Sequence, residues 1–345
     1  MKLLVLGGTR FLGRHFVDAA LARGHEVTIF TRGRTPPPWG DRVAALTGDR
    51  DPRVGAGLAA LTAGAWDAAV DTSGYVPRVV GASAELLAPR VGRYLFVSSV
   101  SVYESNARPG IDESAAVAKL ADPATEDILP NYGALKAACE TVVAAHFGNR
   151  ATQVRPGLIV GPHDGTDRFG YWVARFVHPA LLGDRPAQAI VPAPPTAPIQ
   201  VIDARDLAAW MLNLLERDVG GTYNAVSPAG RWTMGDLVAT LEAAAAAAPP
   251  APAWLDDATL LAHGVEPWVG LPLWIPASDP DAAGFMSIDG ARASAAGLTP
   301  RGLRHTVADT AAWLAGRDNA GAWKLVLSAA RERAILAGAA PSGLG

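Results

Sequence analysis

The sequence KLLVLGGTRFLG, residues 2–13, places a glycine-rich turn directly after a short apolar run. The apolar run predicts a buried β-strand, and the residues after the turn predict a helix through about Arg23. Gly7 and Gly13 stand where a tight turn and a close helix–strand contact require a residue without a side chain. The start of such a helix points free N–H groups and its positive dipole end at the turn. The turn therefore predicts a site for the pyrophosphate of a dinucleotide.

The first half of the chain continues this alternation of strand-like and helix-like segments. A helix is expected over 79–89, and the further strand-like runs are EVTIF (26–30), RVAALTGD (42–49), WDAAVDTS (66–73), RYLFVSS (93–99) and ATQVRPGLIVG (151–161). Strands that alternate with helices are joined by right-handed crossovers. We therefore predict an α/β fold, a Rossmann-type doubly wound parallel sheet with a smaller C-terminal substrate lobe.

The second half of the chain is less regular. The runs HDGTDRFGYWVARF (163–176) and VPAPPTAPIQ (191–200) are loop-like, and AAAAAAPPAPA (243–253) reads as a helix end followed by a linker. Eight of the ten tryptophans follow residue 150, which favours a lobe with aromatic walls. The expected division is a dinucleotide-binding core (1–160, with 198–226 returning to it), a substrate lobe (161–197 and 227–318) and a C-terminal helix (319–345).

Composition excludes several classes of protein. Of the 345 residues 50% are hydrophobic and 18% are charged, so the chain can bury a core and is not globally disordered. The net charge of −3 argues against an extended nucleic-acid footprint.

The single cysteine, Cys139, excludes an internal disulfide and fits a packing residue in a reducing compartment. The apolar start is too short for a signal peptide or a membrane span, so we expect a cytoplasmic protein without a membrane partner. The scattered His163, His178, His263 and His305 predict no metal site.

The end of the second strand-like run indicates which cofactor is bound. An acidic residue there would hydrogen-bond the adenine ribose of NAD, whereas basic residues accommodate the additional phosphate of NADP. The sequence IFTRGRT contains Thr31, Arg32 and Arg34 and no carboxylate. Arg10, in the neighbouring turn, could contact the same phosphate. We expect NADP(H) in preference to NAD(H); the alternative is a solvated basic turn.

A tyrosine and a lysine four residues apart, in NYGALKAACE (131–140), share one face of the expected helix. The tyrosine is Tyr132 and the lysine is Lys136. A nearby ammonium favours the phenolate and lowers the pKa of a tyrosine toward neutral pH. Upstream, YLFVSSVSVYE (94–104) ends a strand in a cluster of serines, where a hydroxyl can orient a substrate oxygen. Together these residues predict proton transfer to or from an oxygen.

With these motifs in this order, residues 1 to about 225 resemble the short-chain dehydrogenase/reductase superfamily, in its extended or atypical branch, and are similar to the nucleotide-sugar epimerase/dehydratase group. The resemblance implies that Tyr132 is the proton donor or acceptor and that Lys136 lowers its pKa and binds the nicotinamide ribose. It implies that Ser99, four residues before Tyr103, hydrogen-bonds the reacting oxygen. The cofactor-binding residues that it implies, besides Tyr132 and Lys136, are Gly7, Thr9, Arg10, Phe11, Leu12, Thr31, Arg32, Arg34, Asp49, Arg50, Thr72, Ser73, Gly74, Ser98, Pro156, Gly157 and Leu158.

The chain departs from that group at several positions. The turn has the form GGxxxxG, and no asparagine occurs between Met1 and Ser105 to support the proton relay. Leu158 stands where nucleotide-sugar enzymes often have a phosphate-binding asparagine, and the apolar APIQ (197–200) replaces a typical phosphate-binding arginine. Because an unpaired phosphate charge is costly to bury, these departures argue for a less charged, apolar or aromatic substrate.

Three functions are compatible with these residues. The leading one is an NADP(H)-dependent oxidoreductase that acts on the carbonyl/alcohol pair of a small molecule not linked to a nucleotide. The second is an epimerase or dehydratase that recycles tightly held NAD(P) through a transient ketone. The third is a cofactor-sensing or RNA-binding protein, since chloroplast RNA-binding relatives have a similar GGTRF turn. The resemblance also implies a homodimer that forms through the long helices flanking the sheet.

Overall fold

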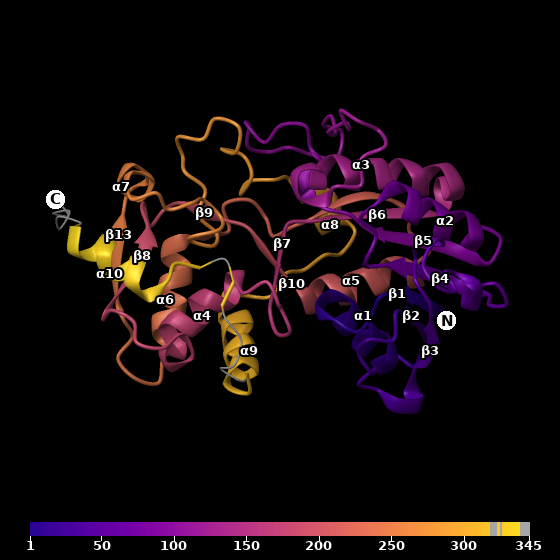
Figure 1. Cartoon of the computed structure of the whole chain (residues 1–345), viewed down its shortest axis with the longest axis horizontal. Helices are drawn as coiled ribbons and strands as arrows, with labels where there is room; N and C mark the ends of the chain where they lie inside the picture. The colour runs from indigo at the N-terminus through magenta and orange to yellow at the C-terminus, as the bar shows by residue number, and fades with distance from the viewer. Residues whose placement is uncertain (318–322, 325, 339–345) are drawn as a thin grey trace.

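Seven parallel strands form the central sheet of the protein, in the order β11-β6-β5-β4-β1-β2-β3. The structure is a computed structural model that describes residues 1–317, 323–324 and 326–338. Figure 1 shows the sheet in the right-hand half of the molecule and a second lobe in the left-hand half. The strands of the sheet are β1 (Lys2–Leu6), β2 (Glu26–Thr31), β3 (Ala44–Thr47), β4 (Trp66–Asp71), β5 (Val91–Val97), β6 (Ala151–Pro156) and β11 (Gly221–Ala225).

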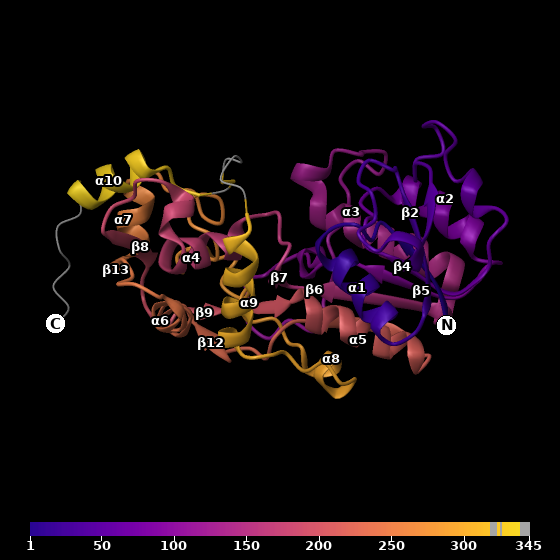
Figure 2. The ribbon, with the colours of Figure 1, turned by 90° about the horizontal axis from the view of Figure 1, so that it is seen from below.

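Helices cover both faces of this sheet. α1 (Phe11–Ala22) and α5 (Ala204–Glu216) lie side by side on one face, and α2 (Pro77–Leu87) and α3 (Ile128–Phe147) lie side by side on the other (Figures 1 and 2). The central strands contain runs of consecutive apolar residues, such as LLVL (3–6) and YLFV (94–97), because both faces are buried under helices. The fold is thus the Rossmann-type doubly wound sheet that the alternating pattern predicts.

The last strands of the sheet differ in detail from the sequence prediction. The expected strand over 151–161 is divided at Gly157 into β6 and a separate β7 (Leu158–Val160), and β7 pairs with β10 (Val201–Asp203). The position at the edge beside β6 is taken by β11, more than sixty residues further along the chain. The residue pattern of 221–225 did not predict a strand. This segment is a strand because it pairs with β6.

A second lobe has its own apolar core. It contains α4 (Arg168–Val177), α6 (Met234–Ala244), α7 (Asp257–Ala262), α9 (Leu303–Ala315) and α10 (Ala329–Gly338), and two small sheets, in which β8 (Gln188–Pro192) pairs with β13 (Ala251–Leu255) and β9 (Pro198–Ile199) with β12 (Trp232–Thr233). α8 (Ala291–Ala295) lies against β11 of the large sheet. The expected C-terminal helix over 319–345 is described only in part, because residues 319–322, 325 and 339–345 lie outside the described residues.

The loop-like interpretation of two segments is wrong. The stretch 163–176 contains most of α4, and the expected linker up to Ala253 runs into β13. In α4, Phe169, Tyr171, Trp172 and Val173 are fully buried. Aromatic and β-branched residues are weak helix formers, so propensity hides this helix and burial in the second lobe stabilises it. Within the described residues, no helix is long and apolar enough to cross a membrane.

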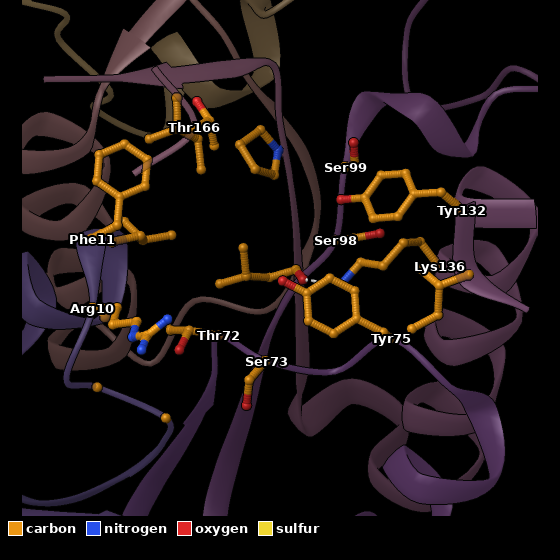
Figure 3. A pocket seen from close by; sticks show the side chains of 18 of the residues that line it. Arg10, Phe11, Thr72, Ser73, Tyr75, Ser98, Ser99, Tyr132, Lys136 and Thr166 are labelled. Atoms are coloured by element: carbon orange, nitrogen blue, oxygen red, sulfur yellow. Dashed lines mark hydrogen bonds between the residues drawn. The ribbon is translucent and has the colours of Figure 1, made fainter. Parts of the chain in front are cut away.

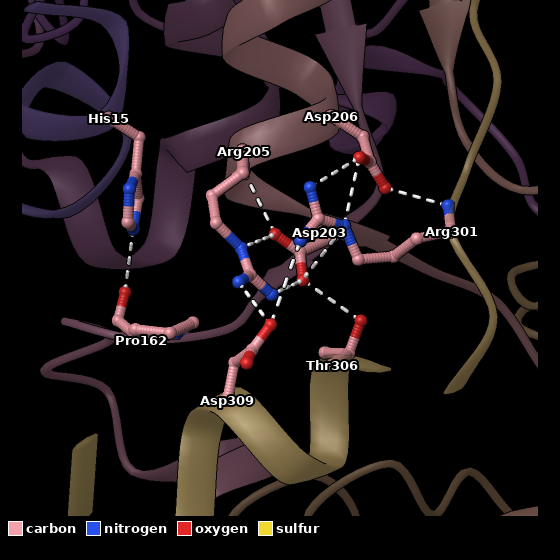
Figure 4. A network of polar contacts seen from close by, with 8 residues as sticks. All are labelled: His15, Pro162, Asp203, Arg205, Asp206, Arg301, Thr306 and Asp309. Carbon is pink, nitrogen blue, oxygen red and sulfur yellow. Dashed lines mark hydrogen bonds and ion pairs between the residues drawn. The ribbon is translucent and has the colours of Figure 1, made fainter. Parts of the chain in front are cut away.

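Polar contacts connect the second lobe to the sheet. Asp203, at the N-cap of α5, accepts hydrogen bonds from the Arg205 side chain and from the hydroxyl of Thr306 on α9 (Figure 4). Arg205 also pairs with Asp309 on α9, and Arg301 pairs with Asp206 on α5. These contacts fix α9 against the start of α5 and thereby fix the wall that the second lobe contributes to the site.

Candidate active site

A cavity of about 1080 Å³ opens at the carboxyl ends of the parallel strands. It lies where the chain order of the sheet changes direction, between β1 and β4, which is the place where open α/β sheets bind ligands. All the site residues predicted from the sequence line this cavity except Gly74. Figure 3 shows Arg10 and Phe11 on one side of it and Ser99, Tyr132 and Lys136 on the other.

The glycine-rich turn lies at one wall of the cavity. Gly7 has a φ of +103°, and a Cβ at this position would lie 2.7 Å from the Thr72 hydroxyl oxygen. A Cβ on Gly13 would lie 2.8 Å from the Cα of Gly8, so α1 could not approach the turn so closely with any other residue. No side chain caps the N-terminus of α1. Its free N–H groups therefore face a space shaped for a pyrophosphate, and the residues present fit a bound dinucleotide.

One end of the cavity is basic. Thr31, at the end of β2, and the exposed Arg32 and Arg34 that follow it line the cavity, as does Arg10 from the turn. Asp49 also lines this end, after β3. The Thr31 hydroxyl accepts a hydrogen bond from the N–H of Gly33, which holds the loop in a tight turn. The structure thus brings the predicted phosphate-binding arginines to the same end of one cavity.

The side chain of Arg50 forms an ion pair with a buried carboxylate at the cavity wall. We expected Arg50 to bind the cofactor; it lines the cavity, and its guanidinium donates to both carboxylate oxygens of Asp71, at 2.6 and 2.7 Å, and to the hydroxyl of Ser83. Asp71 is fully buried at the end of β4 and also accepts a hydrogen bond from the Tyr94 hydroxyl. Arg50 therefore supports the floor of the cavity as the ion-pair partner of a buried carboxylate.

Lys136 is buried on the same side of the cavity as Ser99 and Tyr132 (Figure 3). Its ammonium donates to the carbonyl oxygens of Gly74 and Val97, at 2.7 and 2.6 Å, and lies 4.2 Å from the centre of the Phe96 ring. Burial lowers the pKa of Lys136 to about 8. Gly74, which does not line the cavity, contributes to the site through this carbonyl.

Tyr132 and Ser99 meet at the other end of the cavity from the arginines. Asn131 breaks the regular geometry of α3, so Tyr132 stands at the start of the continuous part of the helix. The Ser99 hydroxyl accepts from the N–H of Ser101 and caps a short 3-10 turn after β5. Burial raises the pKa of Tyr132, and the neighbouring Ser99 hydroxyl acts in the opposite direction. Burial of the phenol is the larger effect, so the net direction is opposite to the lowering that we expected from Lys136.

Several residues that line the cavity were not predicted from the sequence. Tyr75 lies beside Tyr132, with ring centres 6.4 Å apart. Thr166, Arg168, Trp268 and Phe285 reach the cavity from the second lobe. Arg168 stands in the stretch 163–176 that we expected to be loop-like, and both carboxylates of that stretch, Asp164 and Asp167, are buried. Trp268 and Phe285 carry no local signal that places them at this site.

One buried hydroxyl in the cavity wall has no partner in the protein. Ser98 is 3% exposed, and among the described residues its hydroxyl oxygen makes no hydrogen bond. It follows β5 directly and lines the cavity between Val97 and Ser99. A buried hydroxyl without a partner is costly, so a ligand group at this point would satisfy it.

Comparisons with known proteins agree with this geometry. The chain is 29% identical over 175 residues to the chloroplast stem-loop binding protein of 41 kDa b of Arabidopsis thaliana, covering 47% of this chain and 43% of the relative. It is 34% identical over 183 residues to the 2-alkyl-3-oxoalkanoate reductase of Stenotrophomonas maltophilia, covering 48% of this chain and 52% of the relative. The chain therefore spans about half the length of the curated relatives that it matches.

A solved structure shows the same fold at low sequence identity. The UDP-glucuronic acid 4-epimerase of Bacillus cereus, in complex with NAD, superposes with a TM-score of 0.63 at 15% identity, covering 91% of this chain and 99% of the other. The fold is that of a Rossmann-type dinucleotide-binding protein, and the cavity lies at the switch point of its sheet. Residues 3–225 match the family of NAD dependent epimerases and dehydratases, and the chain belongs to this family.

Proposed function

We propose that the protein is an NADP(H)-dependent oxidoreductase that interconverts a carbonyl group and an alcohol in a small molecule not linked to a nucleotide. The observation that carries this proposal is the cavity that has Ser99, Tyr132 and Lys136 at one end and Arg32 and Arg34 at the other. The curated relative from Stenotrophomonas maltophilia is named as a reductase of oxoalkanoates, which supports carbonyl reduction.

The chemistry divides between cofactor and protein. Bound NADPH supplies a hydride to the carbonyl carbon, so that one carbonyl, one NADPH and one proton give one alcohol and one NADP⁺. The Ser99 hydroxyl donates a hydrogen bond to the carbonyl oxygen and orients it. Tyr132 donates its proton to the same oxygen. Because burial raises the pKa of Tyr132, the phenol is held in the protonated form that reduction requires.

Lys136 supplies positive charge beneath this end of the cavity. Its ammonium is held by two carbonyl oxygens at the ends of β4 and β5, so its position is fixed independently of the tyrosine. A fixed positive charge one helical turn from Tyr132 stabilises the phenolate that remains after proton donation. Lys136 thus favours complete transfer of the proton from Tyr132 to the substrate oxygen.

The basic end of the cavity supports NADP(H) in preference to NAD(H). Three arginines line it, and no carboxylate follows β2 in the position that would accept from ribose hydroxyls. Arg32 and Arg34 are free to form charge-assisted hydrogen bonds with a phosphate.

The substrate end of the cavity does not fit a nucleotide diphosphate. Leu158 lines it at the position where an asparagine would contact a phosphate. Gln200, in the segment that replaces a phosphate-binding arginine, is buried and bonded to the backbone of Ser227 and Ile288. Tyr75, Ile128, Trp268 and Phe285 instead present apolar surface to this end. A small organic carbonyl compound suits these walls.

The test is NADPH oxidation with a panel of aldehydes and ketones, followed at 340 nm. We expect Tyr132→Phe to lower kcat about 10²–10⁴-fold, the usual contribution of general acid catalysis. Tyr223→Phe is the matched control, since its hydroxyl bonds to the Gly220 carbonyl away from the cavity. Unchanged turnover in Tyr132→Phe would refute the proposed role of this residue.

A second candidate function is favoured by family membership. An epimerase or dehydratase would oxidise and then re-reduce its substrate with the same tightly held cofactor. Such an enzyme would retain NAD(P) through purification and would show no net NADPH consumption with any carbonyl. Cofactor content, measured after denaturation of the purified protein, distinguishes this candidate from the first.

A further inference from the structure

Arg168 places a positive charge in the substrate end of the cavity. It is the first residue of α4 and lines the cavity together with Tyr132, Thr166, Trp268 and Phe285. Its guanidinium carbon lies 5.5 Å from the centre of the Trp268 ring. Arg168 therefore shares one cavity with Tyr132, and the charge of Arg168 acts to lower the pKa of Tyr132.

Two carboxylates stand near Arg168 in the sequence. Asp167 accepts from Arg317 at 2.6 Å and from the N–H of Lys324. Asp164 accepts from the N–H of Thr166 at 2.8 Å through one oxygen, whereas its other oxygen is buried without a hydrogen-bond partner among the described residues. The charge of Asp164 acts to raise the pKa of Arg168 but makes no ion pair with it. Arg168 itself donates only through Nε, to the Thr166 hydroxyl at 3.2 Å. Among the residues that the structure describes, no carboxylate forms an ion pair with Arg168, and its two terminal nitrogens make no hydrogen bond.

This environment is costly for a cation that no carboxylate contacts directly. Burial lowers the pKa of Arg168, although a guanidinium remains charged at neutral pH. Stacking on Trp268 offsets part of the lost hydration. The two free terminal nitrogens have the geometry that binds both oxygens of a carboxylate. An anionic ligand group at this point would therefore be held strongly.

Resting on the proposed function, we propose that Arg168 binds the carboxylate of an oxo-acid substrate whose ketone oxygen is held by Ser99 and Tyr132. The apolar part of the acid would pack on Trp268 and Phe285, whose rings lie 5.5 Å apart in an edge-to-face arrangement. One guanidinium matches a single negative charge. A diphosphate would need further cations. Arg10 lies across the cavity from Tyr132 (Figure 3), and Arg32 and Arg34 follow β2, which β1 and β4 separate from β5 in the sheet.

The experiment compares an oxo acid with its neutral ester. The probes are 4-oxooctanoate, its methyl ester and octan-2-one, each with NADPH. We expect Arg168→Gln to lower kcat/KM for 4-oxooctanoate about 30–150-fold, the usual effect of losing a charge-assisted hydrogen bond. The ester and octan-2-one should change less than about threefold, and Arg168→Lys should recover part of the loss for the acid. Arg304→Gln, an exposed arginine on α9, is the matched control.

Two readouts separate this inference from the proposed function. Calorimetry measures the binding of NADPH, and of 4-oxooctanoate to the NADP⁺-saturated protein, in the wild type and in Arg168→Gln. We expect unchanged NADPH binding and at least tenfold weaker acid binding in the variant. If the wild type reduces no carbonyl compound, the proposed function fails, but acid binding that depends on Arg168 still supports the role of this residue.

Other outcomes overturn the inference. Equal kcat/KM for the acid and its ester, unaffected by Arg168→Gln, would refute carboxylate recognition and leave the proposed reductase intact. Competition of UDP with 4-oxooctanoate, lost in Arg168→Gln, would assign Arg168 to a phosphate instead. A lower melting temperature for Arg168→Gln with equal losses for all three carbonyl compounds would give it a structural role.

Discussion

Arg50 and Asp71 form a bidentate ion pair beneath the cofactor cavity, with both N–O distances at 2.7 Å or less. The pair joins the loop after β3 to the end of β4, and Asp71 has no exposed surface. A buried carboxylate of this kind is tolerated only while its hydrogen-bond partners remain. The pair therefore determines the conformation of the loop that carries Asp49 toward the cavity.

We expect Arg50→Met to lower the free energy of unfolding by roughly 3–5 kcal/mol, because Asp71 would stay buried without its cation. Urea denaturation at neutral pH measures this change. Arg53→Met, three residues further on at an exposed position, should change stability by less than about 0.5 kcal/mol. A loss below about 1 kcal/mol for Arg50→Met would contradict a structural role for the pair.

The double variant Arg32→Ala/Arg34→Ala should bind NADPH about 10–100-fold more weakly, since two charge-assisted contacts to the ribose phosphate are lost. Binding of NADH should stay within about twofold, because NADH has no such phosphate. Fluorescence titration measures both dissociation constants, and Arg42→Ala, exposed and outside the cavity, is the control. Tighter NADH than NADPH binding by the wild type would exclude the NADP preference.

Lys136 predicts a specific dependence of stability on pH. Its pKa falls from the ordinary lysine value of 10.5 to about 8 in the folded protein, so between these values the unfolded chain binds more protons. Stability therefore rises with pH across this interval. Relative to Lys136→Met, the wild type should gain about 2 kcal/mol between pH 7 and pH 9.5.

Urea unfolding of both proteins at the two pH values measures this gain, and other titrating groups cancel in the difference. The exposed Lys119→Met should show no comparable trend. A wild-type advantage that is constant with pH would mean that the ammonium of Lys136 is not desolvated in the folded protein.

Thr306→Val should lower the free energy of unfolding by about 1–3 kcal/mol, because it removes a hydrogen bond from the buried carboxylate of Asp203 and leaves the shape unchanged. Asp309→Asn removes an ion pair to Arg205 at a half-exposed position and should cost less than about 1 kcal/mol. Thermal unfolding of both variants tests this order (Figure 4). The reverse order would show that the exposed pair holds α9 in place.

Much of the cofactor site could be predicted from the sequence because its motifs are local. The turn at Gly7, the arginines after β2 and the spacing of Tyr132 and Lys136 each depend on a single strand–turn–helix unit or a single helix. In a parallel sheet such units end at the same edge, so their residues meet without further information. The same reasoning could not give the ion pair of Arg50 with Asp71, because Asp71 ends β4, which β1 and β2 separate from β3 in the sheet.

The sequence by itself determined the doubly wound sheet, the glycine-rich turn and the helical spacing that brings Tyr132 and Lys136 to one cavity. Only the tertiary structure decided which side chains form the substrate end. In the sequence, Arg168 is more than one hundred residues from Phe285, and Trp268 lies between them. All three line the cavity with Tyr132 only because the second lobe packs against the sheet. Periodicity and turn chemistry act over a few residues, whereas burial of the second lobe's core acts over the whole chain.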